Sequence, residues 1–357
     1  MKRTVIIAAL AACTPLIANA QTNPLTISGY VEGYYTYDFA KPVNNLRPTF
    51  TYHYNRVNEV NLNLGILKAA YATDHVRASL ALMAGTYSHY NLAAEAEVFR
   101  NLYEANAGVK LSKNSNLWLD AGIFAAHIGW ESAIGKDNWT LTRSIAAENS
   151  PYYEAGAKVS YTSSDNKWFL SGLVLNGWQR IQRPDGNRSA AFATQVTYKP
   201  TSSVTLNSST FIGNDKPEAS RQYRYFHNFY GILQLNKQVG LILGFDAGAE
   251  QKAKGSEEHN TWYSPVAILR YQPSSKVSLA GRAEYYSDEN GVIIATGTPN
   301  GFKTWGYSAN IDYSPYQNIM FRIEGKAFVS RDAIFSNENS FPANSNSAIT
   351  AAVAVSF

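Results

Sequence analysis

The sequence predicts an all-β protein, a closed antiparallel up-and-down transmembrane barrel of about sixteen strands. Three observations predict this fold. Apolar and polar residues alternate along many extended segments, the connections between these segments alternate between short and long, and the alternation runs to the last residue, Phe357.

The alternation appears first in residues 25–39. Leu25, Ile27 and Val31 fall on one face of an extended segment, and Thr26 and Glu32 fall on the other. Residues 239–250 and 319–330 repeat this pattern. Strands of about ten or more residues with hydrocarbon on one face and charge on the other suit a tilted transmembrane strand, whereas strands of soluble sandwiches are usually about half as long.

The connections set the strand number and the orientation. The short ones are 73–74, 112–115, 163–166, 200–202, 236–238, 273–275 and 314–317, and the long ones are 41–54, 89–97, 131–150, 179–187, 214–221, 252–258, 289–302 and 331–345. Transmembrane barrels have tight periplasmic turns and long external loops. We therefore expect about sixteen strands, an even number, with both termini on the periplasmic side.

The N-terminus predicts export. Lys2 and Arg3 precede an apolar run over residues 5–17, and Ala18-Asn19-Ala20 has the small-x-small pattern of a cleavage site. This indicates a signal peptide over residues 1–20 and a single-domain barrel over residues 21–357. The alternative is a lipoprotein box at residues 10–13, which would leave an acylated Cys13 at the N-terminus.

Composition and motifs argue against several other classes. The formal net charge of +4 is no polyanion-binding signal, and no run of 18 apolar residues follows the signal segment. The six histidines show no metal-ligand spacing, and neither a phosphate-binding glycine loop nor a Gly-x-Ser-x-Gly elbow is found. We expect no enzymatic activity, no cofactor and no metal.

Tyrosines at strand ends predict a membrane girdle. Tyr161, Tyr198, Tyr271 and Tyr313 each fall on the apolar face just before a short turn. Amphipathic rings settle at the membrane–water interface, which would place these four on the periplasmic side. The alternative is that Tyr-x-Pro, which begins at three of these four tyrosines, simply ends strands.

The C-terminus predicts an assembly signal. Ile349, Val353 and Val355 alternate with small or polar residues up to Phe357. This resembles the C-terminal signature by which outer-membrane barrels are presented to the barrel-insertion machinery. The sequence therefore implies that this machinery and outer-membrane lipid are partners.

A more specific resemblance lies in residues 120–178. Its motifs are AGIF at 121–124, HIGWE at 127–131, Asn138 followed by TRS at 142–144, PYYEAG at 151–156 and LNGW at 175–178. This stretch resembles the OmpL-like outer-membrane β-barrel porin family. The resemblance implies a pore-forming barrel and does not imply a particular solute.

The same stretch contains the longest connection, residues 131–150. Its candidate constriction residues are Glu131, Lys136, Asp137, Asn138 and Arg143. Loops longer than about twelve residues are usually functional or disordered. If the loop folds into the lumen it narrows the barrel, and if it stays outside its charges are an ordinary solvated surface.

Charged side chains opposite the apolar faces are candidate pore-lining residues. They are Glu59, Arg77, Glu104, Lys110, Asp120, Arg282, Glu284, Arg322, Glu324 and Lys326. Each would cost about 2–4 kcal/mol in hydrocarbon near the membrane midplane, so they have to point inward. They could form a transverse electric field or, more simply, a salt-bridged wall.

These observations predict a porin, a passive diffusion channel for small hydrophilic solutes in the outer membrane of a Gram-negative bacterium, with a homotrimer as a candidate assembly. One alternative is a surface adhesin or receptor barrel that acts through its external loops. Another is a substrate-selective uptake channel in which inward aromatics such as Trp118, Phe124, Tyr286 and Phe328 stack on flat solutes.

Overall fold

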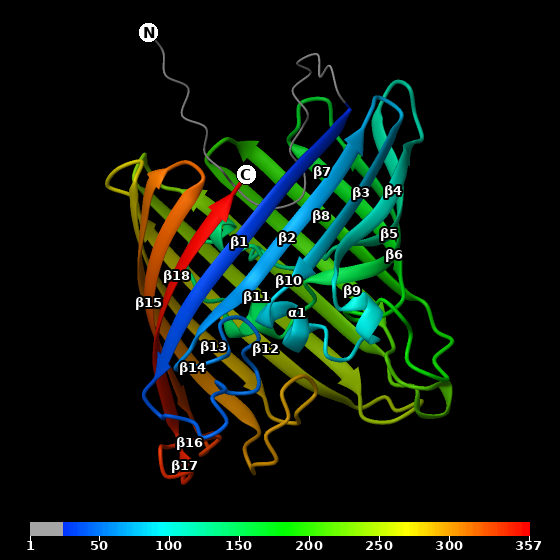
Figure 1. Ribbon diagram of the computed structural model, residues 1–357. Coiled ribbons are helices and arrows are strands. Elements are labelled where there is room, and N and C mark those ends of the chain that lie inside the picture. The colour runs from blue at the N-terminus through cyan, green and yellow to red at the C-terminus, as the bar shows by residue number, and fades with distance from the viewer. Residues whose placement is uncertain (1–23) are drawn as a thin grey trace.

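The computed structural model describes residues 24–357 and confirms the predicted fold. Sixteen antiparallel strands form one closed barrel (Figure 1). The predicted signal peptide, residues 1–20, and the alternative acylation site at Cys13 lie outside the described residues.

The barrel strands follow the chain in order. They are β1 (Leu25–Asp38), β2 (Val60–Ala72), β3 (Val76–Ala84), β4 (Leu102–Lys110), β5 (Asn116–Ala125), β6 (Tyr153–Thr162), β7 (Trp168–Leu175), β8 (Ala191–Thr201), β9 (Val204–Gly213), β10 (Arg224–Gln234), β11 (Val239–Gln251), β12 (His259–Tyr271), β13 (Val277–Asp288), β14 (Phe302–Tyr316), β15 (Ile319–Ser330) and β18 (Ser345–Ser356). The connections hold α1 (Thr86–Asn91), η1 (Glu97–Phe99), η2 (Gly135–Asp137), α2 (Ile145–Glu148), η3 (Glu218–Ser220) and the small hairpin of β16 (Phe335–Ser336) and β17 (Pro342–Ala343).

The last barrel strand, β18, closes the sheet. It pairs with β15 on one side and with β1 on the other, where Tyr30 faces Ser356 and Asp38 faces Ala348. At the end of this seam the Phe357 amide donates to the Gly29 carbonyl at 3.0 Å, and the Gly29 amide donates to the Phe357 carbonyl at 2.8 Å. Closure matters because an open sheet edge in lipid leaves backbone groups without partners.

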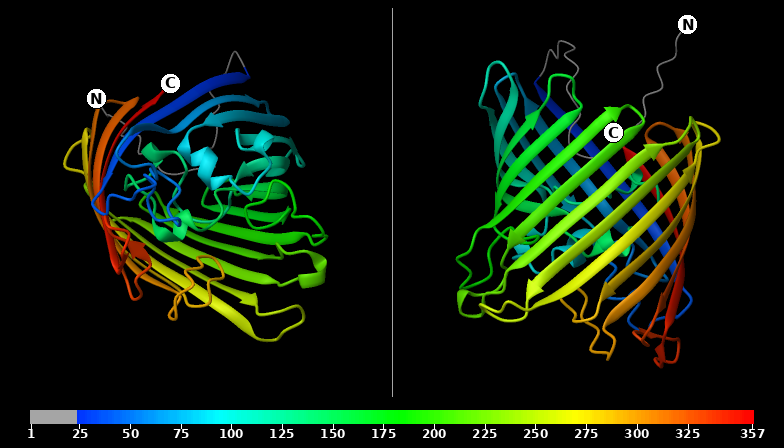
Figure 2. Two further views of the ribbon diagram at one scale, coloured as in Figure 1. Left: turned by 60° about the horizontal axis from the view of Figure 1, so that its bottom comes forward. Right: turned by 180° about the vertical axis from the view of Figure 1, so that it is seen from behind.

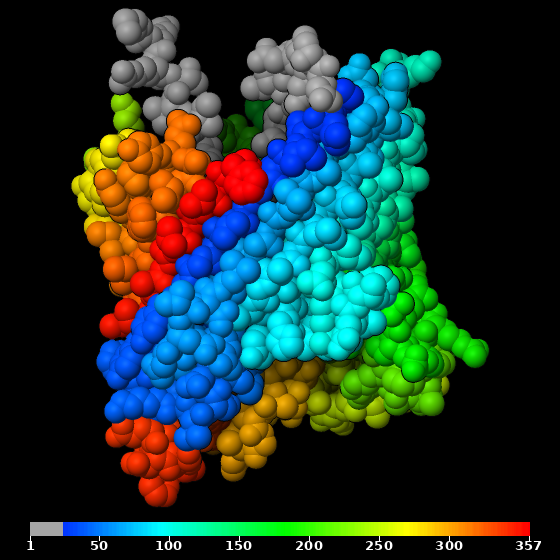
Figure 3. Space-filling view, viewed as in Figure 1, coloured from blue at the N-terminus to red at the C-terminus, as the bar shows by residue number. Residues whose placement is uncertain are grey.

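The period-two pattern has the predicted phase. Val31 and Ile323 are 48% and 53% exposed on the outer surface, whereas Glu32 and Glu324 point inward and are 0% and 1% exposed. The outer surface of β18, β1 and β2 forms adjacent oblique stripes in the space-filling view (Figure 3). The lipid-facing belt is therefore built from one face of every strand.

The two ends of the barrel differ as predicted. The C-terminus lies at the end with the short turns, and the longer connections gather at the other end (Figure 1). Within residues 24–357 no helix is long and apolar enough to cross a membrane.

We predict that Phe357→Asp lowers the amount of protein in the outer membrane while export continues. The ring lies directly over Gly29, where a Cβ atom would be 2.2 Å from it, and a charge there would lose this contact at a lipid-exposed seam. Cell fractionation measures the effect. Phe341→Asp, at an exposed loop residue, is the matched control, and equal levels of the two variants would contradict the prediction.

Candidate functional site

The connection between β5 and β6, residues 126–152, lies inside the barrel. We call it L3. Seen from the end with the long loops, its ribbon crosses the interior of the ring of strands (Figure 2, left). Its residues form hydrogen bonds with the inner faces of β13 and β15. Of the two placements left open by the sequence, the structure therefore shows the inward one.

Two wall carboxylates hold the backbone of L3. Glu324 accepts a hydrogen bond from the Thr142 amide at 2.6 Å and another from the Thr142 hydroxyl at 2.7 Å. Glu284 accepts from the Ile145 amide at 2.5 Å, at the start of α2. Charge-assisted hydrogen bonds of this kind are about twice as strong as neutral ones. The sequence-predicted pore-lining pair Glu284 and Glu324 thus anchors the loop.

Two wall arginines bind carbonyl groups of the same loop. Arg282 donates to the Thr142 carbonyl at 2.7 Å, and Arg322 donates to the Gly135 carbonyl at 2.7 Å. Arg322 also forms a two-pronged ion pair with Asp312 on β14, at 2.7 and 2.8 Å. Each guanidinium therefore links the wall to L3 and to a carboxylate at once.

These charges form one buried network. Arg282 lies 3.2 Å from Glu324, 3.4 Å from Glu284 and 3.7 Å from Glu131 of L3, while Lys326 lies 3.2 Å from Glu284. Their side chains are at most 3% exposed. The alternation along the strands predicted that these wall residues point inward, and they do. However, L3 separates them from water. Removal of one partner from such a network costs about 3–5 kcal/mol.

Arg143 shapes the loop from within. Its guanidinium donates to the carbonyls of Ser132, Leu141 and Ala133 at 2.7, 2.5 and 3.1 Å, and it is 0% exposed. Lys326 donates to the Arg143 carbonyl at 2.7 Å. The charge of Arg143 thus faces the protein, and we do not expect its neutralisation to change ion preference directly.

Of the other four candidate residues of L3, two form hydrogen bonds within the loop and two are partly exposed to solvent. Glu131 accepts hydrogen bonds from Ser144, and Asn138 bonds to the L3 backbone. Lys136 and Asp137 are only half-buried, and Lys136 reaches a serine of β18 at 2.7 Å. Burial raises the pKa of Asp137. These two neighbours are therefore the charges that L3 presents to solvent.

Wall glycines receive the tryptophans of L3. A Cβ atom at Gly244 would lie 2.1 Å from the Trp130 ring, and one at Gly240 would lie 2.6 Å from the Trp139 ring. Sequence analysis did not predict that these glycines leave room for the two tryptophan rings. The sequence contained an indication of this packing, because β11 has glycines at inward positions and the long loop contains tryptophans.

A buried histidine, His127, connects the start of L3 to the barrel wall through hydrogen bonds. The His127 Nδ1 atom lies 2.9 Å from the Glu154 carboxylate on β6, and Nε2 lies 2.9 Å from the Thr210 carbonyl on β9. Burial alone would lower the pKa of His127, but the Glu154 charge and these hydrogen bonds raise it. Sequence analysis placed this histidine in the family motif and found no metal-ligand spacing for it, but did not predict its positioning role.

The first external connection, residues 39–59, covers L3 and is called L1. Glu148 of α2 accepts from the Tyr52 amide at 3.0 Å and lies 3.2 Å from the His53 ring nitrogen. The His53 ring stacks on Tyr87 of α1, with centroids 4.4 Å apart. L1, α1 and L3 are thus fastened to one another within the lumen.

Aromatic packing fills much of the half of the lumen near the long loops. Phe50 of L1 contacts Phe302 and Phe328 at centroid distances of 4.8 and 5.2 Å. Phe124, Tyr286 and Phe328, which the uptake alternative assigned to solute stacking, are 4%, 1% and 0% exposed in this packing. Trp118 lies apart from it and stacks on Arg77 at 4.3 Å.

The inner wall formed by β2–β6 keeps solvent-exposed charges. Lys68 pairs with Glu104 at 2.6 Å, and Arg77 pairs with Asp120 at 2.6 and 2.5 Å. The Lys68 and Arg77 side chains are 35% and 38% exposed. Gly108 lies between Arg77 and Asp120, and its missing side chain lets the two meet across β4.

The remaining two predicted pore-lining residues lie at opposite ends of the wall. Lys110, the last residue of β4, is half-buried, and its side chain has no partner within residues 24–357. Glu59 precedes β2 at the end with the long loops and pairs with Arg56 at 2.7 Å.

The predicted girdle tyrosines lie on the outer surface near the short turns. Tyr271 and Tyr313 are 44% and 47% exposed, and Tyr198 stacks on Trp168 at 4.1 Å. Tyr161 is half-buried at the penultimate position of β6. The girdle itself stays a prediction, which these positions suit.

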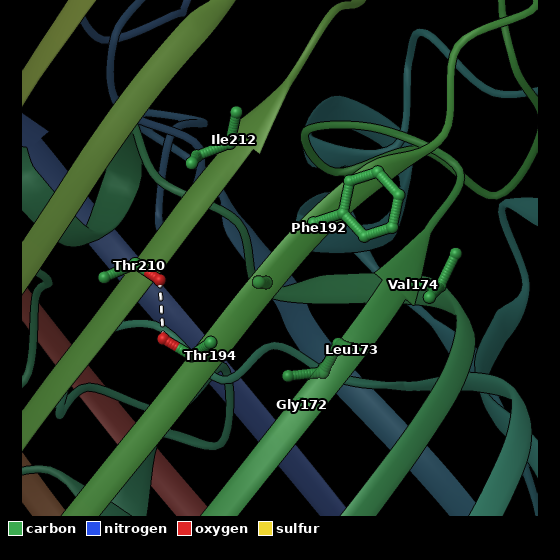
Figure 4. Close-up of a pocket in the computed structure, with 8 residues that line it drawn as sticks. Gly172, Leu173, Val174, Phe192, Thr194, Thr210 and Ile212 are labelled. Atoms are coloured by element: carbon green, nitrogen blue, oxygen red, sulfur yellow. Dashed lines mark hydrogen bonds between the residues drawn. The ribbon is translucent and has the colours of Figure 1, made fainter.

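A shallow hollow of about 370 Å³ lies on the outer surface over β7–β9 (Figure 4). Gly172, Phe192 and Ile212 line it, and the Thr194 and Thr210 hydroxyls satisfy one another there at 2.7 Å. Because these residues face away from the lumen, the hollow is separate from the L3 site.

A closed sixteen-stranded barrel with a loop anchored across its lumen defines the porin class of outer-membrane proteins. The family described as "Putative beta-barrel porin-2, OmpL-like" matches residues 24–357, so the chain belongs to this family. The family resemblance found in the sequence is confirmed, and the porin prediction with it. No curated protein is similar enough to this chain to count as a relative.

Solved porins have the same fold. An anion-selective porin from Comamonas acidovorans is 8% identical, with a TM-score of 0.61, over 93% of this chain and 99% of that one. OmpT of Vibrio cholerae is 9% identical, with a TM-score of 0.61, over 94% and 99%. OprB of Pseudomonas putida is 10% identical, with a TM-score of 0.59, over 94% of each chain. At these identities the likeness concerns the fold.

We predict that Gly244→Val loosens L3. The new side chain would collide with Trp130, and overpacking of this kind costs about 1–3 kcal/mol. We expect a lower temperature of barrel unfolding, read by heat-dependent gel mobility, and larger current fluctuations. Gly325→Val is the control, because Gly325 has open space at its Cβ position. An unfolding temperature equal to that of the control would show that the Trp130 ring does not need a glycine at position 244.

We predict that acid loosens the contact between L1 and L3. Burial lowers the pKa of His53 from its ordinary 6.5. Burial opposes ionisation of Glu148, but His53 and the Tyr52 amide lower the pKa of Glu148 below its ordinary 4.5. Both groups bind protons less readily when folded, so this stabilisation is complete above pH 6.5 and is lost as the pH falls through the lowered values.

Hydrogen exchange measures this effect. After correction for intrinsic rates, we expect exchange of residues 50–55 to rise by about tenfold or more between pH 7 and pH 4, since one pKa unit corresponds to a tenfold change. The exposed connection 252–258 should show no such rise. Unchanged protection of residues 50–55 would overturn the proposed coupling.

Proposed function

We propose that the protein is a passive diffusion channel for small hydrophilic solutes and that L3 is its constriction. The observation that carries this proposal is the unequal covering of the inner wall. Arg282 and Arg322 are 0% exposed beneath L3, whereas Lys68 and Arg77 on the β2–β6 side are 35% and 38% exposed. The solute path of this proposal therefore passes the exposed charges of the β2–β6 wall in the half of the lumen near the short turns.

The path is narrow in this proposal. The aromatic contacts of Phe50 with Phe302 and Phe328 occupy the half of the lumen near the long loops. A sixteen-stranded barrel is wide enough for a water-filled channel, so the inner loops set the limiting width. Small polar solutes fit such a path better than large ones.

The route to the membrane is also part of the proposal. Cleavage after Ala20 would release the mature chain, and the barrel-insertion machinery would read the strand that ends at Phe357. One similar structure is a trimer form of OmpT from Vibrio cholerae, which supports a homotrimer as the assembly to test here. Chemical crosslinking of the detergent-folded protein distinguishes a trimer from a monomer.

The constriction is tested by single-channel recording in a planar bilayer. We predict that deletion of residues 133–140 raises the conductance severalfold, because this segment contributes the Gly135 carbonyl and Trp139 contacts that hold L3 across the lumen. Deletion of residues 253–257, in the exposed connection between β11 and β12, is the control and should leave conductance unchanged.

Two results would contradict the proposal in different ways. Equal conductance of the folded 133–140 deletion and the parent would show that L3 does not limit the current. Absence of any channel in the parent would instead favour a surface adhesin or receptor that acts through its external loops.

A further inference from the structure

Charges on the inner wall differ in whether they can act on a passing ion. The network of Arg282, Glu284, Glu324 and Lys326 lies under L3, with side chains at most 3% exposed and with opposite charges within 4 Å of one another. Protein atoms separate these groups from the solute path, and their charges offset one another. Selectivity must therefore come mainly from the charges that L3 leaves exposed.

The carboxylates on this exposed surface are compensated. Glu104 binds Lys68 at 2.6 Å and Asp120 binds Arg77 at 2.5 Å. The half-buried Asp137 of L3 is next to Lys136 in sequence, and the positive charge of that lysine lowers the pKa of Asp137 against the effect of burial. None of these carboxylates is an isolated negative charge.

Three half-buried cations of the barrel strands lack a carboxylate partner within 4 Å among residues 24–357. They are Lys110, Lys158 and Arg270, all half-buried on the inner wall. Lys158 lies 4.6 Å over the Phe124 ring, and Arg270 lies 4.1 Å over the Trp139 ring of L3. An aromatic ring attracts a cation but does not cancel its charge.

These three cations lie in the same half of the barrel. Lys110 is the last residue of β4, Arg270 is the penultimate residue of β12, and Lys158 lies four residues before the end of β6. All three are in the half of the barrel near the short turns. The turns themselves add exposed cations in excess of exposed carboxylates, namely Lys113, Lys167, Lys237 and Lys276 against Asp74 and Asp165.

Two buried carboxylates elsewhere in the lumen, Glu154 and Glu32, are bonded to protein groups. Glu154 is 0% exposed and forms a hydrogen bond with the His127 ring, so protein groups cover its charge. Glu32 is 0% exposed and accepts hydrogen bonds from the Tyr54 hydroxyl and the Asn63 amide. Donor dipoles of this kind reduce the field of a covered charge at the solute path.

We propose that the channel prefers small anions, inorganic or organic, and that Lys110, Lys158 and Arg270 set this preference. The inference rests on the proposed channel function and adds the solute class. Fixed positive charge along a narrow passage with low-dielectric walls raises the local concentration of anions and lowers that of cations.

The test is the zero-current potential of the purified full-length protein in a planar bilayer under a KCl gradient. We expect a chloride-to-potassium permeability ratio of about 3 or more at about 0.1 M salt, where the screening length is about 10 Å. At about 1 M salt the ratio should approach 1, because the screening length falls to about 3 Å.

The decisive variant is the triple substitution Lys110→Gln, Lys158→Gln and Arg270→Gln, which should bring the ratio close to 1 while conductance persists. Its matched control replaces Lys41, Lys252 and Lys254 by Gln, the same charge change in connections at the end with the long loops, and should keep the parent ratio. Heat-dependent gel mobility verifies that both variants fold, and Lys110→Gln alone should give an intermediate ratio.

The outcomes separate the two proposals. A conducting parent that prefers cations or shows no preference would overturn the inference and leave the channel function standing. A triple variant with the parent ratio would overturn the assignment of the preference to these residues. A parent with no conductance would overturn the proposed function and this inference with it.

Discussion

The structure depends on one constraint, which is that a chain in hydrocarbon has to pair every backbone amide and carbonyl within the protein. The seam between β1 and β18 meets this requirement and closes the sheet. Closure fixes an inside and an outside for each strand, so residues such as Arg322 and Glu324 have to share the lumen. The lumen then needs water or protein groups that can bind these charges.

L3 and the charged wall supply hydrogen-bond partners for each other. Within residues 126–152 only η2 and α2 are regular, so many amides and carbonyls of L3 have no partner within the loop. Glu284 and Glu324 bind the amides, and Arg282, Arg322 and Lys326 bind the carbonyls. Either side alone would leave buried polar groups without hydrogen bonds, at a cost of about 1–3 kcal/mol each.

The strands and their facing were predictable from the sequence because lipid enforces a period of two. The conformation of L3 was not, because its anchors are distant in the chain, as in the Thr142–Glu324 contact across 182 residues. Residue type alone could not show that the Arg143 charge faces the protein. Lys158 and Arg270 were within reach of parity reasoning but were not among the candidates, because no local motif marks them.

The bonds between Arg322 and L3 also bear on the order of assembly. The contact between Arg322 and Gly135 spans 187 residues, so the entropy of closing that stretch of chain opposes it until the intervening strands are paired. Contacts of such high sequence separation form slowly. A chain that has not yet added β15 lacks Arg322, Glu324 and Lys326, and it can hold L3 only through earlier strands such as β13. The proposed constriction loop therefore gains its full set of wall contacts only near the end of assembly, and before that point the lumen would be wider than in the finished barrel.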